Sequence, residues 1–216
     1  MKKTKTNILT SFAAILVLAF SIMLLYSGKA YAQNNYFNNY YASVNGGMTL
    51  ITPGGVTLIT PTEFSSKSGG TANISLGKNY NFNNYIIGDE VSLGYENSHS
   101  WTVNNFDGYG DNTTLTLHSI YYIAAIKAGY AMNNIMPFVK LGYIGDEYNA
   151  SASFSGPYSN LYGSMSHNSY EGGLLYGIGV EYMLNQNWGM QAQYSNALLA
   201  GKDRMENFTL GISYNF

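Results

Sequence analysis

Apolar and polar residues alternate with a period of two along most of the chain after residue 40. The segment 208–216, FTLGISYNF, places its apolar residues on one face: Phe208, Leu210, Ile212, Tyr214 and Phe216. A period of two is that of a β-strand, whose successive side chains point to opposite faces. After residue 32 no apolar run is long enough for a transmembrane helix. The alternation therefore predicts an all-β protein with one apolar sheet face.

Eight segments carry the alternation and predict eight strands. Six alternate cleanly, at 41–50, 71–77, 90–96, 175–183, 188–195 and 208–216. Two are less regular: 117–132 is apolar on both faces in its middle, where we expect a β-bulge, and 138–148 alternates only in its first half. The chain has 21 tyrosines, 24 glycines and four prolines, a composition that favours strands over helices.

The first 32 residues have the features of a secretory signal peptide. A basic start, MKKTKTN, is followed by an apolar run from Ile8 to Leu25 and by Ala30–Ala32, which has the small-x-small form of a cleavage site. The alternative is an uncleaved anchor, since an apolar run of this length can span a bilayer. We expect residues 1–32 to be removed and 33–216 to form one domain.

Charge and cysteine content exclude several classes of protein. Four of the ten basic residues lie in the leader, which leaves six against twelve acidic residues, a net charge of −6. Nucleic acid is therefore not an expected partner, since phosphate binding needs a basic face. The absence of cysteine excludes disulfides, thiolate metal sites and a cysteine nucleophile. We expect neither a cofactor nor a bound metal.

The connections between the predicted strands are of two kinds. Short asparagine-rich turns lie at 81–84, 133–136 and 185–187, where Asn tolerates the positive φ of a tight hairpin. Long polar connections lie at about 52–69, 99–112 and 151–170, with a shorter one at 200–203. Short turns on one side and long loops on the other are typical of outer-membrane barrels, whose loops face the exterior.

The two strand faces distinguish a membrane barrel from a soluble sandwich. The apolar face carries aromatic residues near strand ends, as a girdle at the lipid headgroups requires: Tyr80, Tyr130, Tyr182, Trp188 and Tyr214. The other face alternates Gly and Ser with isolated charges, which suits the interior of a narrow barrel. Lipid also requires every strand edge to be paired, so the first and last strands must join. We therefore predict an eight-stranded antiparallel up-and-down transmembrane β-barrel.

The segment 173–194, GLLYGIGVEYMLNQNWGMQAQY, followed by 208–216 resembles the closing strands of the small bacterial outer-membrane β-barrel superfamily. That superfamily includes the OmpA membrane domain, OmpX, Ail and the opacity proteins. The resemblance implies a monomer in the outer membrane of a Gram-negative bacterium, in contact with its lipid and lipopolysaccharide, with a role in adhesion, serum resistance or envelope integrity. The last strand, with Phe216 at its end, also resembles the C-terminal signature that the barrel assembly machinery reads.

Six charged residues fall on the predicted interior face: Glu90, Glu96, Lys127, Lys140, Asp146 and Glu181. A charge in a narrow lumen is stable only if it is paired and hydrogen-bonded. We therefore predict a network in which Lys127 and Lys140 contact some of these acids. The network serves either as a polar plug or, alternatively, as an ion path through a narrow pore.

Two patterns suggest catalysis or metal binding. The segment 193–197, QYSNA, resembles the His-x-Ser-Asn motif of lipid A deacylases, with Ser195 in the matching place. Gln193 stands in place of the histidine, and an amide cannot act as the general base that a serine nucleophile needs. The histidines His99, His118 and His167 are expected to be solvated residues of separate loops. We therefore predict no enzyme site, with a lipid A-modifying barrel as the alternative.

Aromatic residues in the long loops are the predicted binding residues. They are Trp101, Phe106, Tyr109, Phe154, Tyr158 and Tyr162, in a background of Ser, Gly and Asn. Exposed aromatics in such a background make adaptable contact surfaces at modest entropic cost. The sequence thus favours a structural or adhesive surface protein whose loops bind a host or envelope partner, with loops of no fixed partner as the alternative.

Overall fold

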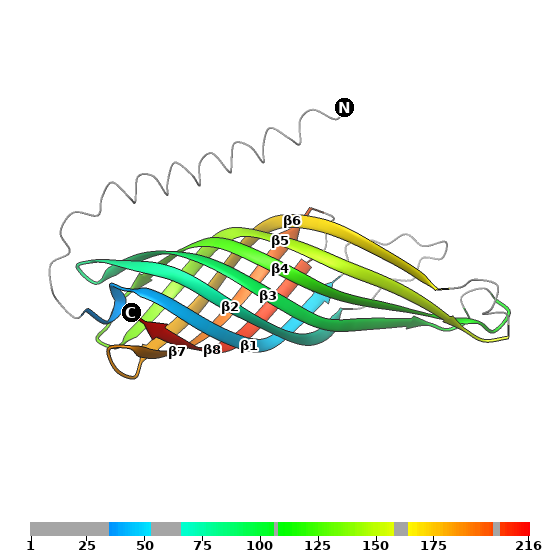
Figure 1. Ribbon diagram of the computed structural model, residues 1–216, viewed down its shortest axis with the longest axis horizontal. Coiled ribbons are helices and arrows are strands. Elements are labelled where there is room, and N and C mark those ends of the chain that lie inside the picture. The colour runs from blue at the N-terminus through cyan, green and yellow to red at the C-terminus, as the bar shows by residue number, and fades with distance from the viewer. Residues whose placement is uncertain (1–34, 53–65, 106–107, 158–163, 201–203) are drawn as a thin grey trace, which may run out of the picture. The chain divides into compact units, whose positions relative to one another are not determined.

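The computed structural model describes residues 35–52, 66–105, 108–157, 164–200 and 204–216, and within them eight antiparallel strands form a closed barrel (Figure 1). The strands are β1 (Tyr40–Thr52), β2 (Lys67–Phe82), β3 (Tyr85–Val103), β4 (Asn112–Tyr130), β5 (Ile135–Ser155), β6 (Met165–Met183), β7 (Trp188–Leu199) and β8 (Arg204–Asn215). Each strand pairs with its neighbours in sequence, and β1 pairs with β8. The predicted up-and-down barrel is confirmed; the expected signal peptide, residues 1–32, lies outside the described residues.

Outward-facing side chains of the barrel are apolar, as the alternation predicted. Ile178, Met190 and Ile212 are 61%, 52% and 55% exposed, whereas the adjacent Gly177 and Ser213 are buried. Such an exposed apolar surface is stable only where lipid covers it. The polar face of each strand therefore lines the lumen, and the apolar face contacts the bilayer.

The short turns gather at one end of the barrel, here called the turn end. Asn83, Asn84 and Asn133 have φ angles of 52°, 74° and 56°, the left-handed conformation that was expected of asparagine in these hairpins. Aromatic residues ring the outside at this level, with Tyr85 against Tyr130 and Trp188 against Tyr214 in edge-to-face contacts of 5.2 and 4.9 Å between ring centroids. This ring matches the girdle that headgroup contact requires.

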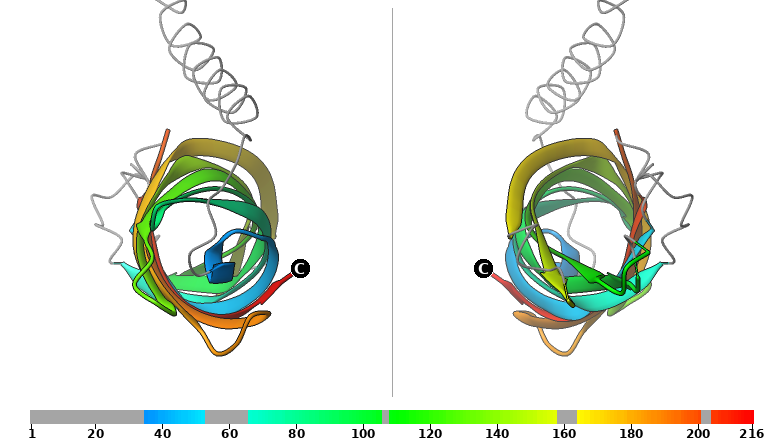
Figure 2. Two further views of the ribbon diagram at one scale, coloured as in Figure 1. Left: turned by 90° about the vertical axis from the view of Figure 1, so that its left-hand side faces the viewer. Right: turned by 90° about the vertical axis from the view of Figure 1, so that its right-hand side faces the viewer.

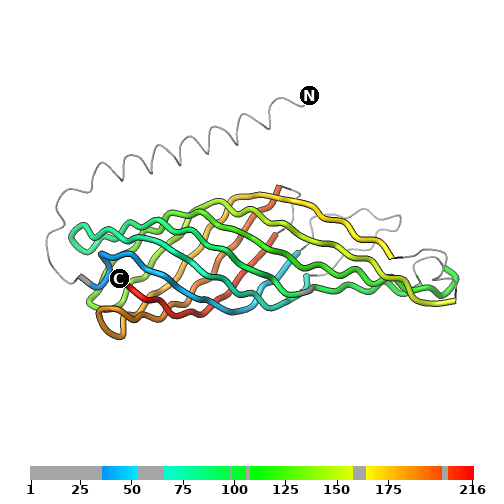
Figure 3. Tube along the Cα trace, in the orientation of Figure 1, coloured from blue at the N-terminus to red at the C-terminus, as the bar shows by residue number. Residues whose placement is uncertain are grey.

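The opposite end, the loop end, is built unequally because β3, β4, β5 and β6 are longer than the other strands and extend beyond them (Figure 3). Their outer faces there are polar, and threonine and serine hydroxyls pair across β3 and β4: Ser100 with Thr116 at 3.3 Å, and Thr102 with Thr114 at 3.2 Å. The loops predicted at 99–112 and 151–170 are therefore shorter than expected, since much of each segment continues the strands.

Glycines opposite large interior side chains allow the lumen to be filled. Tyr41 is paired in register with Gly77, and Tyr121 with Gly94. A Cβ atom on Gly77 would lie 2.6 Å from the Tyr41 ring, and one on Gly94 would lie 2.2 Å from the Tyr121 ring. The glycine-rich interior face is thus a steric requirement of the aromatic side chains that pack across it.

Two irregularities of the sequence pattern have other causes than the one expected. The middle of β4 is apolar on both faces because Tyr121, Ile123 and Ala125 join an apolar cluster inside the barrel, together with Ile144 of β5. The register of β4 is continuous with β5, and the bulge expected in 117–132 is absent from this described strand. It lies instead in β3, where the register shifts between Glu96 and His99.

The segment before β1 enters the lumen at the turn end. The 3-10 helix η1 (Asn35–Phe37) lies inside the ring of strands (Figure 2). No helix among the described residues is long and apolar enough to cross a membrane. Phe37 is fully buried in a cluster that includes Met136 and Phe138. Asn215 Nδ2 donates to the Tyr36 carbonyl at 2.9 Å. The Asn- and Tyr-rich residues before β1 thus close this end of the lumen.

Candidate functional site at the loop end of the lumen

The middle of the lumen holds a hydrogen-bonded ion pair between β5 and β3. Lys140 Nζ lies 2.6 Å from Glu90 Oε1 and donates a second hydrogen bond to Gln193 Oε1 at 2.8 Å. Glu90 also accepts from the Tyr41 hydroxyl at 2.7 Å and from Ser92 at 3.2 Å. Both charged residues are at most 5% exposed. The negative charge of Glu90 is therefore compensated by a cation and by hydroxyl donors.

A second pair connects β4 to β6. Lys127 Nζ lies 3.5 Å from Glu181 Oε2, and Ser213 donates to the other carboxylate oxygen at 2.8 Å. The Lys127 ammonium also lies 4.4 Å from the centroid of the Tyr41 ring, a cation–π contact. The predicted network between the two lysines and interior acids is confirmed, and the burial of all four side chains is what a polar plug requires.

A different environment begins toward the loop end, where the β3 bulge aims two side chains inward. Glu96 is opposite Ser119 and His99 is opposite Leu117, so three residues of β3 advance past two of β4. Because of this extra residue, Glu96 and His99 both face the lumen although they are three positions apart. Both are buried, at 0% and 1% exposure.

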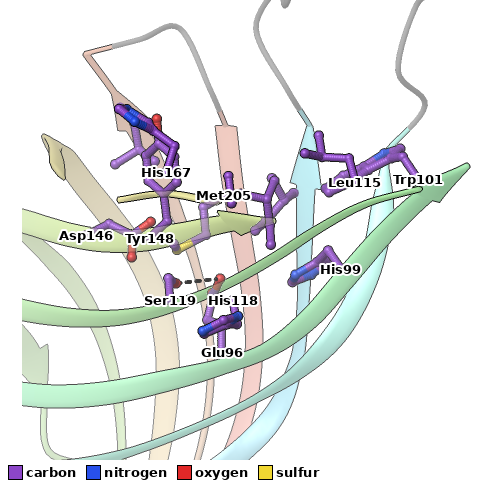
Figure 4. Close-up of a pocket in the computed structure, with 14 residues that line it drawn as sticks. Glu96, His99, Trp101, Leu115, His118, Ser119, Asp146, Tyr148, His167 and Met205 are labelled. Carbon is purple, nitrogen blue, oxygen red and sulfur yellow. Dashed lines mark hydrogen bonds between the residues drawn. The ribbon is translucent and has the colours of Figure 1, made fainter. Parts of the chain in front are cut away.

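These two side chains line a cavity of about 270 Å³ (Figure 4). Its walls are mainly apolar, formed by Ile51, Trp101, Leu115, Leu117, Leu199 and Met205. Figure 4 shows His99 and Trp101 on one side and Asp146 and Tyr148 on the other. The rings of His99 and Trp101 stack, with centroids 6.2 Å apart. The cavity is therefore an apolar chamber with carboxylates in its lining.

Two carboxyl groups line this chamber. Glu96 and the 4%-exposed Asp146 both line it, and Asp146 is opposite Glu171 in register. Ser119 donates to Glu96 Oε2 at 3.4 Å, whereas Oε1 has no hydrogen-bond partner among the described residues. Within the same residues no lysine, arginine or histidine forms an ion pair with Glu96, because the lumen lysines contact Glu90 and Glu181. Glu96 thus lies in apolar surroundings without an ion pair to a lysine or arginine of the described residues.

The structure describes three of the six predicted binding aromatics, and two of these three lie within strands rather than on a loop surface. Trp101 is wrongly placed by the sequence prediction, since it lies within β3, is 4% exposed and lines the chamber. Phe154 lies in β5 and is half-buried, while Tyr109, between β3 and β4, is 74% exposed as expected. The remaining three, Phe106, Tyr158 and Tyr162, lie outside the described residues.

The histidines were expected in separate solvated loops; this is wrong for the buried His99, whereas His167 is exposed as expected, although it too lies on a strand. His99, His118 and His167 lie on β3, β4 and β6, and all three contribute to the lining of the chamber. Among the described residues no group of His, Asp and Glu has the geometry of a metal site. Sequence spacing missed this convergence because it depends on the length of β3–β6 and on the bulge.

The segment that resembles a deacylase motif faces away from lipid. Gln193 accepts a hydrogen bond from Lys140 inside the barrel, and Ser195 is 8% exposed and paired in register with Gly177 of the interior face. A lipid substrate would approach from the outer face, where neither side chain points. The geometry therefore gives no support to acyl-ester hydrolysis at Ser195.

Comparisons with known proteins agree with this architecture. The family model described as "Outer membrane protein beta-barrel domain" matches residues 12–216. The crystal structure of Ail, the attachment invasion locus protein of Yersinia pestis, is similar with a TM-score of 0.52 at 15% identity, covering 83% of this chain and 99% of that one. Neisserial surface protein A gives a TM-score of 0.47 at 17% identity, covering 82% and 97%. No curated protein matches the sequence.

Proposed function

The chain belongs to the outer membrane protein β-barrel domain family and resides in the outer membrane of a Gram-negative bacterium, and from this premise we propose that it is a non-catalytic surface protein with an adhesive role. The observation that carries the proposal is the extension of β3–β6 beyond the lipid-facing belt. Strands beyond the bilayer contribute nothing to spanning it. They present a rigid platform on which short loops meet a partner.

Polar uncharged residues cover the outer faces of this platform. Ser100, Thr102, Thr114 and Thr116 form paired hydroxyl ladders on β3 and β4, and β5 and β6 carry Asn149 and Asn168, whose amides are hydrogen-bonded to each other. Ser, Thr and Asn with nearby aromatics such as Tyr109 form adaptable hydrogen-bonding surfaces. A flat sheet surface of this kind fits a protein or a neutral glycan.

Charge narrows the class of partner further. Residues 97–126 and 141–170, which include the whole platform, contain no lysine or arginine. A polyanion such as a sulfated glycan needs a basic surface, which is absent from these segments. We therefore assign the platform to neutral glycoprotein surfaces of the host or of the envelope, with contact to outer-membrane lipid and lipopolysaccharide through the apolar belt.

Adherence of bacteria that display the protein tests the proposal. The protein is expressed in a non-adherent strain, and binding to epithelial cells and to immobilised matrix glycoproteins is counted. A trimmed variant replaces residues 152–165 by Asn-Gly, which shortens the β5–β6 hairpin while leaving the belt intact. The matched control replaces residues 53–65, the β1–β2 connection, in the same way.

The platform hypothesis predicts a loss of adherence for the trimmed β5–β6 variant and none for the β1–β2 control. Added heparin should not compete, because the platform carries no basic residues. Heat-modifiable gel mobility would verify that each variant is a closed barrel. Equal adherence of the trimmed variant, the control and the empty strain would refute the adhesive role.

Two further expectations belong to this proposal. The protein is a monomer, and the barrel assembly machinery recognises its last strand, which ends in Phe216.

A further inference from the structure

The chamber at the loop end differs from the middle of the lumen in that Glu96 has no ion pair with a lysine of the described residues. In the middle, Glu90 and Glu181 each contact a lysine and at least one hydroxyl donor. In the chamber, Thr49 is the neighbour of both Glu96 and His99, but Glu96 Oε1 and the ring nitrogens of His99 make no hydrogen bond of normal geometry among the described residues, although both side chains are at least 99% buried. A buried carboxylate without full compensation is costly, so it indicates a missing partner.

The chemistry of that partner follows from the lining. Two carboxylates, Glu96 and Asp146, favour a cation, while Leu117, Leu199 and Met205 favour an apolar body. Trp101, stacked on His99, adds an aromatic face of the kind that attracts ammonium groups. We propose that the chamber binds a small amphipathic amine, with its ammonium at Glu96 and His99 and its apolar part between Trp101, Leu117 and Met205.

Size limits the ligand to a compact molecule. The cavity of about 270 Å³ corresponds to roughly nine water volumes, which is enough for a compact organic molecule. A water cluster alone suits the site poorly, since most of the lining offers no hydrogen-bond partner. A metal ion suits it poorly too, because the described His, Asp and Glu side chains do not converge at ligand distances.

The β3 bulge is the device that builds this site. Without the extra residue between Glu96 and His99, a regular strand would turn one of these side chains to the outer face. Bulges re-aim side chains at the rims of barrels in this way. The closed wall of strands separates the chamber from the bilayer, so the ligand enters from the loop end. This inference is independent of the adhesive role.

Trp101 provides a direct probe of occupancy. The chain has two tryptophans, and the substitution Trp188→Phe on the outer girdle leaves Trp101 as the only one. This protein is placed in phosphatidylcholine nanodiscs, and Trp101 fluorescence is titrated with 2-phenylethylamine. Two isosteres, neutral 2-phenylethanol and anionic 3-phenylpropanoate, separate the contribution of charge from that of the apolar body.

We expect saturable binding of the amine, at least tenfold weaker binding of the alcohol and no binding of the carboxylate, since a charge-assisted contact contributes roughly a tenfold or greater difference. Glu96→Gln should remove the preference for the amine and leave alcohol binding unchanged. The matched control Glu206→Gln removes a charge near the same end of the barrel but on the outer face, beside Arg204, and should leave both affinities unchanged. Leu117→Phe, which fills the chamber, should abolish binding of amine and alcohol alike.

Three results would overturn the proposal: no saturable response to the amine, equal affinity for all three probes, or equal effects of Glu96→Gln and Glu206→Gln. Equal affinity for all three probes would indicate that the chamber binds any apolar molecule. Equal effects of the two substitutions would indicate that the overall charge of the protein surface, rather than Glu96, attracts the amine. Gel mobility of the unboiled protein checks that the Glu96→Gln variant forms a closed barrel. Leu117→Phe retains Glu96 and provides an independent test.

Discussion

Removing the Lys140 ammonium should destabilise the barrel far more than removing an equally close charge from its outer face. The pair Lys140–Glu90 is 2.6 Å long, and its side chains are 4% and 3% exposed. At an effective dielectric constant of about 20, Coulomb's law gives an attraction of roughly 6 kcal/mol, before the cost of desolvation. Breaking such a pair by removing one partner costs about 3–5 kcal/mol, because the other charge stays buried.

The outer pair Arg204–Glu206 is the matched control. Its atoms are 3.0 Å apart, but its side chains are 50% and 25% exposed. In water the same arithmetic gives little more than about 1 kcal/mol, and exposed pairs contribute about 0–1 kcal/mol. Geometry is therefore similar in the two pairs, and burial is the difference that the comparison measures.

Double-mutant cycles with Lys140→Met and Glu90→Gln, and with Arg204→Met and Glu206→Gln, measure the two coupling energies. Urea unfolding in phosphatidylcholine vesicles, followed by tryptophan fluorescence, gives the free energy of unfolding of each variant. We expect a coupling of about 2 kcal/mol or more for the lumen pair and below about 1 kcal/mol for the outer pair. Equal couplings would mean that the lumen behaves as a hydrated, high-dielectric space, and the plug interpretation would fail.

Three further substitutions test the packing of the same barrel. Gly94→Val should destabilise it by about 1–3 kcal/mol or prevent closure, because the new Cβ would lie 2.2 Å from the Tyr121 ring, whereas Gly46→Ala, with 3.9 Å to its nearest atom, should be neutral in the same urea assay. Phe37→Ala should cost about 3–5 kcal/mol and increase protease access at the turn end, measured by limited proteolysis. Asn133→Val should cost about 1–2 kcal/mol, since φ is 56° there, and Asn133→Gly should not; refolding yield on unboiled gels would show the difference.

The fold is predictable from the sequence because lipid leaves few solutions. Strands that cross lipid must have every edge paired, and only a closed barrel of the alternating segments after residue 40 does so. Two of the three turns were equally predictable, since Asn83, Asn84 and Asn133 adopt the positive φ that their residue type allows. In the third, no asparagine has a positive φ, and Asn185 Oδ1 instead accepts hydrogen bonds from the backbone N–H groups of Asn187 and Trp188. The positions of the charged residues in the lumen followed from the alternation alone. Once one residue of a strand is assigned to the inner face, every second residue shares that face unless the register shifts.

Strand length at the loop end was not predictable by the same reasoning. Beyond the belt the outer strand face is polar, as with Ser100 and Thr102 on β3, so these segments lose the apolar outer face by which the membrane strands were recognised. The remaining sign of strands was that Trp101, Leu115 and Leu117 alternate with polar residues. Without knowledge of the cross-strand pairing, these residues cannot be distinguished from apolar residues of a loop. For the same reason Trp101 was assigned to an exposed surface when it is buried inside.

The bulge between Glu96 and His99 explains why the chamber was the hardest feature to foresee. A bulge shifts the face of every later residue on its strand, so His99 and Trp101 point inward where continued alternation from Glu96 would point them outward. The burial of His99 and Trp101 therefore results from one inserted residue and could not be inferred from the identity of these two residues. An extra residue in β3 disrupts the ladder of hydrogen bonds locally, and in return it turns both Glu96 and His99 into the chamber. Deleting one residue of the bulge should therefore abolish amine binding while leaving the Lys140–Glu90 plug and the belt intact, because both lie toward the turn end from the shift.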